Sequence, residues 1–500
     1  MKQPQFTLTD FVSEEFTRYI STEVPHRLID TSTMKFVERA AFFDVFSEEI
    51  GRISEEDIAT RMRSSTKDGV TTPRNVALRE IIENAVKYAT LSHCWTDDEP
   101  SYRDICAGNQ RKHHGFRKLS HFCEAAKSQG YALAWSDTCC INESNRTEHV
   151  EAVQSASNWC AHSHLCIIHL AESTSYSDLS SETWFTRSWT LLELLVPKQI
   201  KLYNTHWQPL TNFINDKDDE NLMAAISAVT LIPKEVLIAD NRRGLKGRGV
   251  WEIMSWASKR KSTRVEDMAY SLCGLFNITI PIAYGEGDRA FYKLLEAIIN
   301  KRKCSWDVFA WAGVPSGYHS TLPSTPRCYP VPDKDLMDGN VGVTDFSITT
   351  HGLSLTSVPL IPLEFDSWVS TAAGSVTVTL RPRPTPELGR YSGVEVVRGV
   401  LGPWHLRELR EAQDLRACIL NYRLVGQNEQ GELTVGQDYV CFLLHSRHWL
   451  PEGPTWRKFT TDNQLRISYR EGPTRLNFGP ETKVFTFPLE KAHVEAQCLS

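Results

Sequence analysis

Between residues 88 and 203, short apolar runs alternate with longer segments of helical periodicity. Segments 115–130 and 147–161 repeat apolar residues every three to four positions, as amphipathic helices do. The apolar runs resemble strands that are buried on both faces, and they lie at 88–92, 131–136, 164–170 and 200–203. This order predicts an α/β fold, in which a parallel sheet is covered by helices on both faces. Ligands bind such sheets at the carboxyl ends of the strands.

A single carboxylate, that of Glu193, interrupts the apolar run from Trp189 to Val196. Burying an acid is costly unless it faces water, a partner or a ligand. Helical spacing places Trp189 and Val196 on the buried face of a short helix, with Glu193 beside that face. Two interpretations stay open. Glu193 is either a solvated residue that pairs with the nearby Arg187 or Lys198, or it is a functional carboxylate.

The length of 500 residues exceeds one ordinary hydrophobic core, so several domains are expected. We predict an N-terminal helical or extended lead-in, an α/β domain, a helical extension and a β-rich C-terminal domain of antiparallel strands, at 1–80, 81–215, 216–315 and 316–500. The helices of the extension are expected at 221–230, 249–260, 266–276 and 288–301. The clearest C-terminal strands are expected at 375–380, 417–425, 439–444 and 483–487.

The composition is that of a folded protein, and it disfavours several functional classes. Hydrophobic residues make up 41% of the chain and charged residues 23%, which argues against long disorder. The formal net charge of −6 gives no support for nucleic-acid binding. No apolar run approaches the roughly 20 residues that a membrane span requires. Because residues 1–10 also lack the apolar core of a signal peptide, we expect a cytoplasmic protein.

The 13 cysteines form no CxxC pair, so in a reducing compartment they are expected to be free thiols. Cys160, His162, His164 and Cys166 occupy alternate positions and suggest a zinc site at first sight. A single intervening residue is, however, too short for the usual spacing of zinc ligands. We therefore predict no metal site and no tightly bound cofactor.

Several ordered motifs resemble the fungal heterokaryon incompatibility (HET) domain of vegetative-incompatibility proteins. They lie at 27–31 (RLIDT), 88–95 (YATLSHCW), 135–142 (WSDTCCIN), 184–197 (WFTRSWTLLELLVP), 255–257 (SWA), 263–270 (TRVEDMAY) and 284–287 (YGEG). The resemblance covers roughly residues 25 to 315. Two positions depart from it, because Thr96 stands where the family usually has Gly and Asn142 where it often has Asp. Since Thr enters positive φ less freely than Gly, the turn after Trp95 is expected to differ or to be strained.

The HET domain is in turn similar to the Toll/interleukin-receptor (TIR) domain, a flavodoxin-like parallel sheet of innate immunity and programmed cell death. Members of that wider group with enzyme activity cleave NAD at the nicotinamide–ribose bond with a helix glutamate. The resemblance implies that Glu193, which follows Trp189, is that residue.

Trp189 and further residues at the ends of the first two predicted strands are candidates for binding the substrate. Ser92, His93 and Trp95 follow the first strand, where a base or nicotinamide ring could stack on the indole. Asp137 follows the second strand and could bind a ribose hydroxyl. The alternatives are that Trp95 belongs to the core while His93 is merely exposed, and that Asp137 only caps a turn.

One carboxylate is sufficient for this chemistry. Positive charge grows on the sugar as a ribosyl bond breaks, and a carboxylate in apolar surroundings stabilises it. Nicotinamide leaves as a neutral molecule, so no second carboxylate is needed to protonate it. Two hypotheses follow: an NAD-cleaving enzyme that self-association activates, or a non-catalytic signalling module that acts through protein partners and in which Glu193 is structural.

Overall fold

The computed structural model describes residues 7–64, 71–239, 243–301, 306–319 and 321–332, and farther along mainly the strands between residues 346 and 478. The chain divides into two compact units, Met1–Lys246 and Gly247–Ser500. The four-part division expected from the sequence is a different subdivision and stays a prediction. The strand expected at 483–487 lies outside the described residues.

The first unit begins with a group of helices that share a hydrophobic core with the sheet that follows. They are α1 (Leu8–Glu23), α2 (Phe42–Val45), α3 (Ser47–Gly51), α4 (Glu55–Ser64) and α5 (Arg74–Ala85). Thr7 caps α1, because its hydroxyl accepts the Asp10 N–H while the Asp10 carboxylate accepts the Thr7 N–H. Phe16 of α1 and Ile82 of α5 belong to the same buried cluster as Ile167 of the sheet. Burial against the sheet thus stabilises these short helices.

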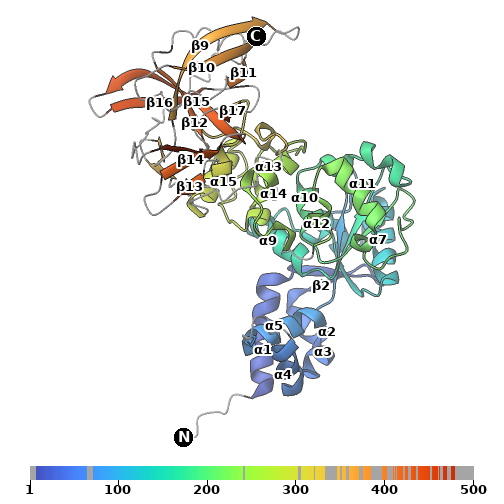
Figure 1. The fold of residues 1–500 in the computed structure, drawn as a ribbon. Helices are drawn as coiled ribbons and strands as arrows, with labels where there is room; N and C mark the ends of the chain where they lie inside the picture. The colour runs from blue at the N-terminus through green and yellow to red at the C-terminus, as the bar shows by residue number, and fades with distance from the viewer. Residues whose placement is uncertain are drawn as a thin grey trace. The chain divides into compact units, whose positions relative to one another are not determined.

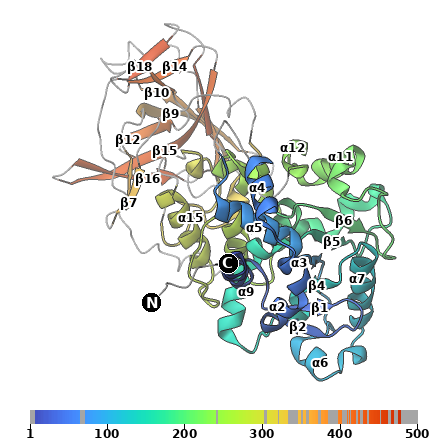
Figure 2. The same cartoon turned by 90° about the horizontal axis from the view of Figure 1, so that it is seen from below.

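The centre of this unit is a six-stranded sheet with the order β2-β1-β4-β3-β5-β6. Its strands are β1 (Arg27–Asp30), β2 (Phe36–Glu38), β3 (Ala89–Ser92), β4 (Leu133–Trp135), β5 (Leu165–His169) and β6 (Ile200–Tyr203). Strands β4, β3, β5 and β6 are parallel, whereas β1 and β2 run antiparallel at one edge. Figure 2 shows β6, β5, β4, β1 and β2 side by side. The predicted α/β fold is confirmed, with an antiparallel addition from the segment taken as a lead-in.

Helices cover both faces of this sheet (Figure 1). The helices between and after the parallel strands are α6 (Tyr102–Cys106), α7 (Phe116–Ser128), α8 (Asp137–Cys140), α9 (Arg146–His162), α10 (Trp189–Leu195), α11 (Glu220–Thr230) and α12 (Lys234–Leu237). Since β4 and β5 flank β3 on opposite sides, right-handed connections place α7 on one face and α9 with α10 on the other. After β3 the chain connects to β4 on one side of the sheet order, and after β5 it connects to β6 on the other side. Doubly wound sheets bind ligands at such a point, at the carboxyl ends of the two strands.

Short 3-10 helices complete the first unit at Arg39–Ala41, Gln110–Lys112, Tyr176–Ser181 (η3), Thr183–Thr186 (η4), Asp216–Asp218 (η5) and Arg243–Leu245 (η6). Four left-handed residues other than glycine occur within the described stretches, and Trp207 is one of them. Its ring lies flat against the imidazole of His169, with the ring centres 4.3 Å apart.

The second unit contains helices followed by antiparallel strands. Its helices are α13 (Val250–Ala257), α14 (Asp267–Phe276) and α15 (Arg289–Lys301), with 3-10 turns at Trp306–Phe309 and Pro326–Cys328. The described strands form a seven-stranded, a three-stranded and a two-stranded sheet, and every pairing among them is antiparallel, as predicted. Across the described part of the chain, no helix combines the length and the apolar character that crossing a bilayer requires.

The strands of the second unit are β7 (Phe346–Thr349), β8 (Gly352–Leu355), β9 (Leu360–Ser370), β10 (Val376–Pro382), β11 (Val397–Leu401), β12 (Asp414–Ile419), β13 (Arg423–Val425), β14 (Gln430–Thr434), β15 (Gln437–Leu450), β16 (Gly453–Phe459), β17 (Leu465–Tyr469) and β18 (Arg475–Phe478).

Candidate functional site

The Glu193 carboxylate lies at the carboxyl end of β3. Its neighbours Leu192 and Leu194 are buried, whereas Glu193 itself is half-buried, as the helical spacing predicts. Ser92, the last residue of β3, is buried, and its hydroxyl donates to Oε2 of Glu193. The structure thus brings together two predicted site residues that lie 101 positions apart in the sequence. Their meeting point is the edge of the sheet at which a ligand is expected.

A third residue, Trp184, completes this contact. Its indole Nε1 donates to the Ser92 hydroxyl oxygen over 2.9 Å, and the whole residue is buried. The backbone carbonyl of Trp184 accepts the Thr190 hydroxyl over 2.6 Å, which fixes η4 to α10. Sequence reasoning did not select Trp184 as a site residue. Its place in the motif at 184–197 was the available signal.

Trp95 lies on the surface near the same edge, and 48% of the residue is exposed. Its Nε1 donates to Oδ2 of Asp137 over 2.9 Å, so the ends of β3 and β4 are linked. Asp137 is also the first residue of α8, and its other oxygen accepts the Thr138 N–H. The alternative in which Trp95 is core and His93 exposed is wrong, because His93 is buried.

Glu99 holds the loop that carries Trp95. Its Oε1 accepts both the backbone N–H and the hydroxyl of Thr96, at 3.2 and 2.9 Å, and the Lys118 ammonium. Burial raises the pKa of Glu99, but the contacts with His93 and Lys118 outweigh it and hold that pKa at about 2. Thr96 is not among the residues with positive φ. The prediction that the backbone is strained at Thr96 is therefore wrong.

The loop and the start of α7 are in close contact. The Gly115 N–H donates to the carbonyl of Asp98 over 2.9 Å, and a Cβ at Gly115 would lie 2.7 Å from that oxygen. The Asp98 carboxylate in turn contacts Nδ1 of His113 at 2.6 Å, and this contact contributes to the raised pKa of the imidazole. Since Gly115, the N-cap residue of α7, has no side chain, the loop packs directly on the start of the helix.

His93 contacts Glu99 and therefore does not join Ser92 at the Glu193 carboxylate. Its Nε2 lies 3.6 Å from the Glu99 carboxylate. The pKa of the nearby His169 is lowered to about 4, chiefly because the residue is buried and also because of the charges of Lys118 and His93. Trp189, the other predicted binding residue, is half-buried at the start of α10. The structure thus brings Glu193 together with Ser92 and Trp95 with Asp137, and it turns His93 toward Glu99.

Three carboxylates and one guanidinium act on the half-buried Cys94 thiol, which follows β3 by two residues. Its pKa is raised to about 11, chiefly by burial; the positive charge of Arg187 opposes this rise, and the carboxylates of Glu182, Glu172 and Glu193 add to it. Cys94 is therefore a protonated thiol and a poor nucleophile. An edge rich in carboxylates favours a ligand on which positive charge is present or develops.

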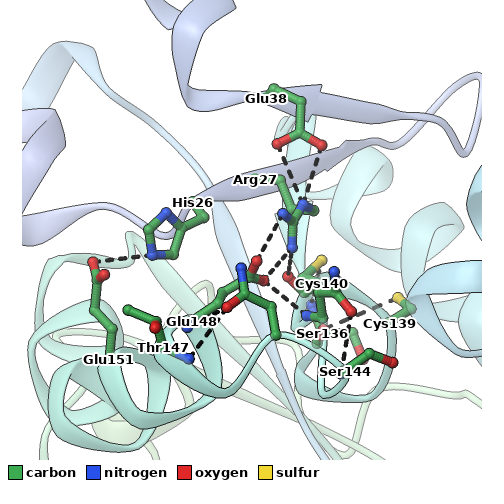
Figure 3. A network of polar contacts seen from close by, with 12 residues as sticks. His26, Arg27, Glu38, Ser136, Cys139, Cys140, Ser144, Thr147, Glu148 and Glu151 are labelled. Carbon is green, nitrogen blue, oxygen red and sulfur yellow. Dashed lines mark hydrogen bonds and ion pairs between the residues drawn. The ribbon is translucent and has the colours of Figure 1, made fainter.

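A buried ion pair supports the loop after β4 (Figure 3). The Arg27 guanidinium forms two bonds with the Glu148 carboxylate and donates to the Cys140 carbonyl over 2.9 Å. Oε1 of Glu148 also accepts the Asn142 N–H over 2.7 Å. Burial raises the pKa of Glu148, but Arg27 and the Asn142 N–H outweigh it and lower the pKa overall. Because this loop begins at Asp137, the ion pair fixes one wall of the site.

Two other features of this unit lie apart from the site. A pocket of about 410 Å³ opens near the start of β6, at the opposite edge of the parallel strands, and is lined by Arg61, Glu80, Glu83, Asn84, Lys198, Gln199, Asn215 and Arg243. Lys198, a cation near Glu193 in the sequence, pairs with Glu83 there. Among the residues that the structure describes, no three His, Cys, Asp or Glu side chains are grouped so that they could hold a metal ion.

Comparison with known proteins finds two similarities to this chain. Residues 88–181 match the family model described as heterokaryon incompatibility protein (HET). The vegetative incompatibility protein HET-E-1 of Podospora anserina is 35% identical over 237 residues, which cover 44% of this chain and 17% of that protein. No solved structure matches the chain. The chain therefore contains a segment, residues 88–181, that is similar to the heterokaryon incompatibility (HET) family, as its motifs predict. The similarity to TIR domains stays a prediction.

Proposed function

We propose that this chain is a cytoplasmic protein of heterokaryon-incompatibility and cell-death signalling, and that its HET domain cleaves NAD at the nicotinamide–ribose bond. One observation carries the enzymatic part of the proposal. A half-buried carboxylate, Glu193, accepts the buried Ser92 hydroxyl at the carboxyl edge of a parallel sheet. The family name of the domain and of HET-E-1 supports the signalling part.

The proposed reaction uses the negative charge of Glu193. As the bond between C1′ and the nicotinamide nitrogen breaks, both electrons pass to the ring nitrogen and positive charge develops on the ribose. The Glu193 carboxylate stabilises that charge, and its buried neighbours Leu192 and Leu194 reduce the screening by water. Water then adds to C1′ and loses a proton. The products are nicotinamide, ADP-ribose and one proton.

Trp95 and Asp137 are the proposed contacts for the substrate. The exposed indole offers a flat face to a base or nicotinamide ring, and its bond to Asp137 fixes the ring plane. The Asp137 carboxylate oxygens can accept further hydrogen bonds, and a ribose hydroxyl is a suitable donor. Self-association of the chain is proposed to activate this edge, with other protein partners as additional triggers.

Trp95→Ala is expected to weaken binding of NAD. Loss of a stacking surface costs about 1–3 kcal/mol, so the KM should rise roughly fivefold to a hundredfold while kcat changes little. Trp95→Phe keeps an aromatic face and removes only the hydrogen bond to Asp137, and its KM should rise less. Steady-state kinetics of nicotinamide release measure both values. Equal KM values for wild type and Trp95→Ala would show that Trp95 does not bind the substrate.

Incubation of the full chain with NAD tests the proposal. The purified chain, both alone and fused to a ligand-inducible dimerisation domain, is incubated with NAD, and nicotinamide and ADP-ribose are separated by chromatography. We expect equal amounts of both products, with more turnover after dimerisation. Absence of nicotinamide in both forms would contradict the enzymatic proposal. A cell-death phenotype that persists without turnover would instead support the non-catalytic signalling module.

A further inference from the structure

We propose that Trp184 is a positioning residue that acts through Ser92 to aim the Glu193 carboxylate and to keep it charged. The hydrogen bonds of Trp184 and Ser92 are the physical basis of this inference. Its consequence for catalysis rests on the proposed function. Trp184 has no direct contact with a substrate in this proposal, because the residue is fully buried.

The direction of the two hydrogen bonds follows from the chemistry of the groups. An indole N–H can only donate, so the Ser92 oxygen must accept from Trp184. The single Ser92 proton is then directed to Oε2 of Glu193. A hydrogen bond to a charged acceptor is stronger than one to a neutral acceptor, at about 1.5–3 against 0.5–1.5 kcal/mol. The chain of bonds therefore favours the ionised form of Glu193, and each bond polarises the next.

These contacts close a ring that begins and ends on α10. Thr190 of α10 donates to the Trp184 carbonyl over 2.6 Å, the Trp184 indole donates to Ser92, and Ser92 donates to Glu193 of α10. Because Thr190 and Glu193 belong to the same helix, the indole cannot move without disturbing the carboxylate. Catalytic groups depend on such support for their orientation.

The loop between β5 and α10 holds Trp184 in this position. The buried Glu182 carboxylate accepts the Ser173 hydroxyl over 2.8 Å and the Glu172 N–H over 3.0 Å. The Glu172 carboxylate accepts the Thr183 N–H over 2.8 Å. Two carboxylates therefore bind the exit of β5 to the residues just before the indole. A change in the conformation of this loop would therefore move Trp184 and, through Ser92, affect the Glu193 carboxylate.

Other charged and titratable groups near Glu193 act on its ionisation together with the indole. The Cys94 and Cys166 thiols both experience the Glu193 charge, and burial raises their pKa values to about 11 and 12. Arg187, Glu172 and Glu182 act on the Cys94 thiol at the same edge. Trp184→Phe leaves all of these groups in place, so none of them accounts for a change in the ionisation of Glu193 in that variant.

The chain offers a matched control for this substitution. Trp135 of β4 is also buried, and within the described residues its Nε1 has no hydrogen-bond partner. Trp135→Phe therefore makes the same change in volume and removes no hydrogen bond. Thermal unfolding of both variants shows whether their folded fractions are comparable.

The ionisation of Glu193 can be measured without any activity. A water-soluble carbodiimide modifies protonated carboxyl groups, so the pH at which Glu193 is half-modified, found by mass spectrometry of peptides, follows its protonation. We expect this midpoint to rise by about half to one pH unit in Trp184→Phe and to stay unchanged in Trp135→Phe. The acidic limb of kcat against pH should move with it, and kcat at its optimum should fall about tenfold.

The outcomes distinguish this inference from the proposed function. If Trp184→Phe and Trp135→Phe show the same labelling midpoint, the positioning role is wrong. If the midpoint shifts but the wild-type chain releases no nicotinamide, the positioning role stands and the proposed enzyme activity fails. Ser92→Ala should shift the midpoint at least as far, and adding Trp184→Phe to it should have little further effect. Full additivity of the two substitutions would also overturn the inference.

A measurement on the wild-type chain decides the matter if Trp184→Phe does not fold. In the spectrum of ¹⁵N-labelled indoles, the Trp184 N–H resonance should shift with pH as Glu193 titrates. The same shift should be absent in Glu193→Gln. An indole spectrum that is independent of pH in the wild type would overturn the coupling between Trp184 and Glu193.

Discussion

Glu193→Gln is expected to abolish release of nicotinamide from NAD, with a fall in kcat/KM of about a thousandfold. Glutamine has the same shape and its amide oxygen can still accept the Ser92 hydroxyl, so the fold is preserved. The substitution removes the negative charge that would stabilise the developing positive charge on the ribose. Loss of one preorganised electrostatic contact in an active site typically costs roughly a hundred- to a thousandfold. Initial rates of nicotinamide release measure the effect.

Asp97→Asn is the matched control for that experiment. Asp97 is an exposed carboxylate in the loop after β3, so its replacement removes one negative charge near the same edge without changing the buried contacts. Its kcat/KM should stay within about twofold of the wild type, because an exposed charge is screened by water and salt. Turnover that survives in Glu193→Gln, or falls equally in both variants, would show that Glu193 is not the catalytic carboxylate.

Arg27→Met is expected to lower the free energy of unfolding of the first unit by about 3–5 kcal/mol. The substitution leaves the buried Glu148 carboxylate without the guanidinium that binds both of its oxygens, and an uncompensated buried charge carries a cost of this size. It also removes the donor to the Cys140 carbonyl. Urea denaturation followed by fluorescence measures the change.

The pH dependence of the same ion pair provides an internal check. The folded-state pKa of Glu148 is lowered, so its contribution is present above the unfolded pKa and is lost as the pH falls through the folded value. The difference in the free energy of unfolding between wild type and Arg27→Met should therefore become smaller at acidic pH. Arg52→Met serves as the control, because the Arg52–Glu48 pair is exposed and should contribute less than about 1 kcal/mol. Similar losses in both variants would contradict the role assigned to Arg27.

The regular elements around the site could be predicted from the sequence because their hydrophobic periodicity is strong. The helix expected at 147–161 is α9 (Arg146–His162), and the strand expected at 164–170 is β5 (Leu165–His169). The antiparallel strands β1 and β2 were not predicted. They contain four and three residues, which is too short for a periodic signal, and the pairing of β1 with β4 joins residues about a hundred positions apart.

The site was predicted in part. The motif order indicated Ser92 and Glu193, which are in contact, and Trp95 and Asp137, which share a hydrogen bond. His93 turns toward the half-buried Glu99 instead, since neighbouring residues at a strand end point to opposite sides. Trp184 escaped selection because its contact with Ser92 joins residues 92 positions apart, and no local pattern reports such a bond.

The anchoring of the Trp95 loop by Glu99 bears on how a ligand meets this edge. Thr96, Lys118 and His93 converge on one carboxylate, so the segment is already ordered before anything binds. Association then needs little conformational search, and its rate should be governed by diffusion and charge more than by folding of the loop. Because Lys118 belongs to α7, a protein that docks on the outer surface of that helix could tilt the indole from a distance.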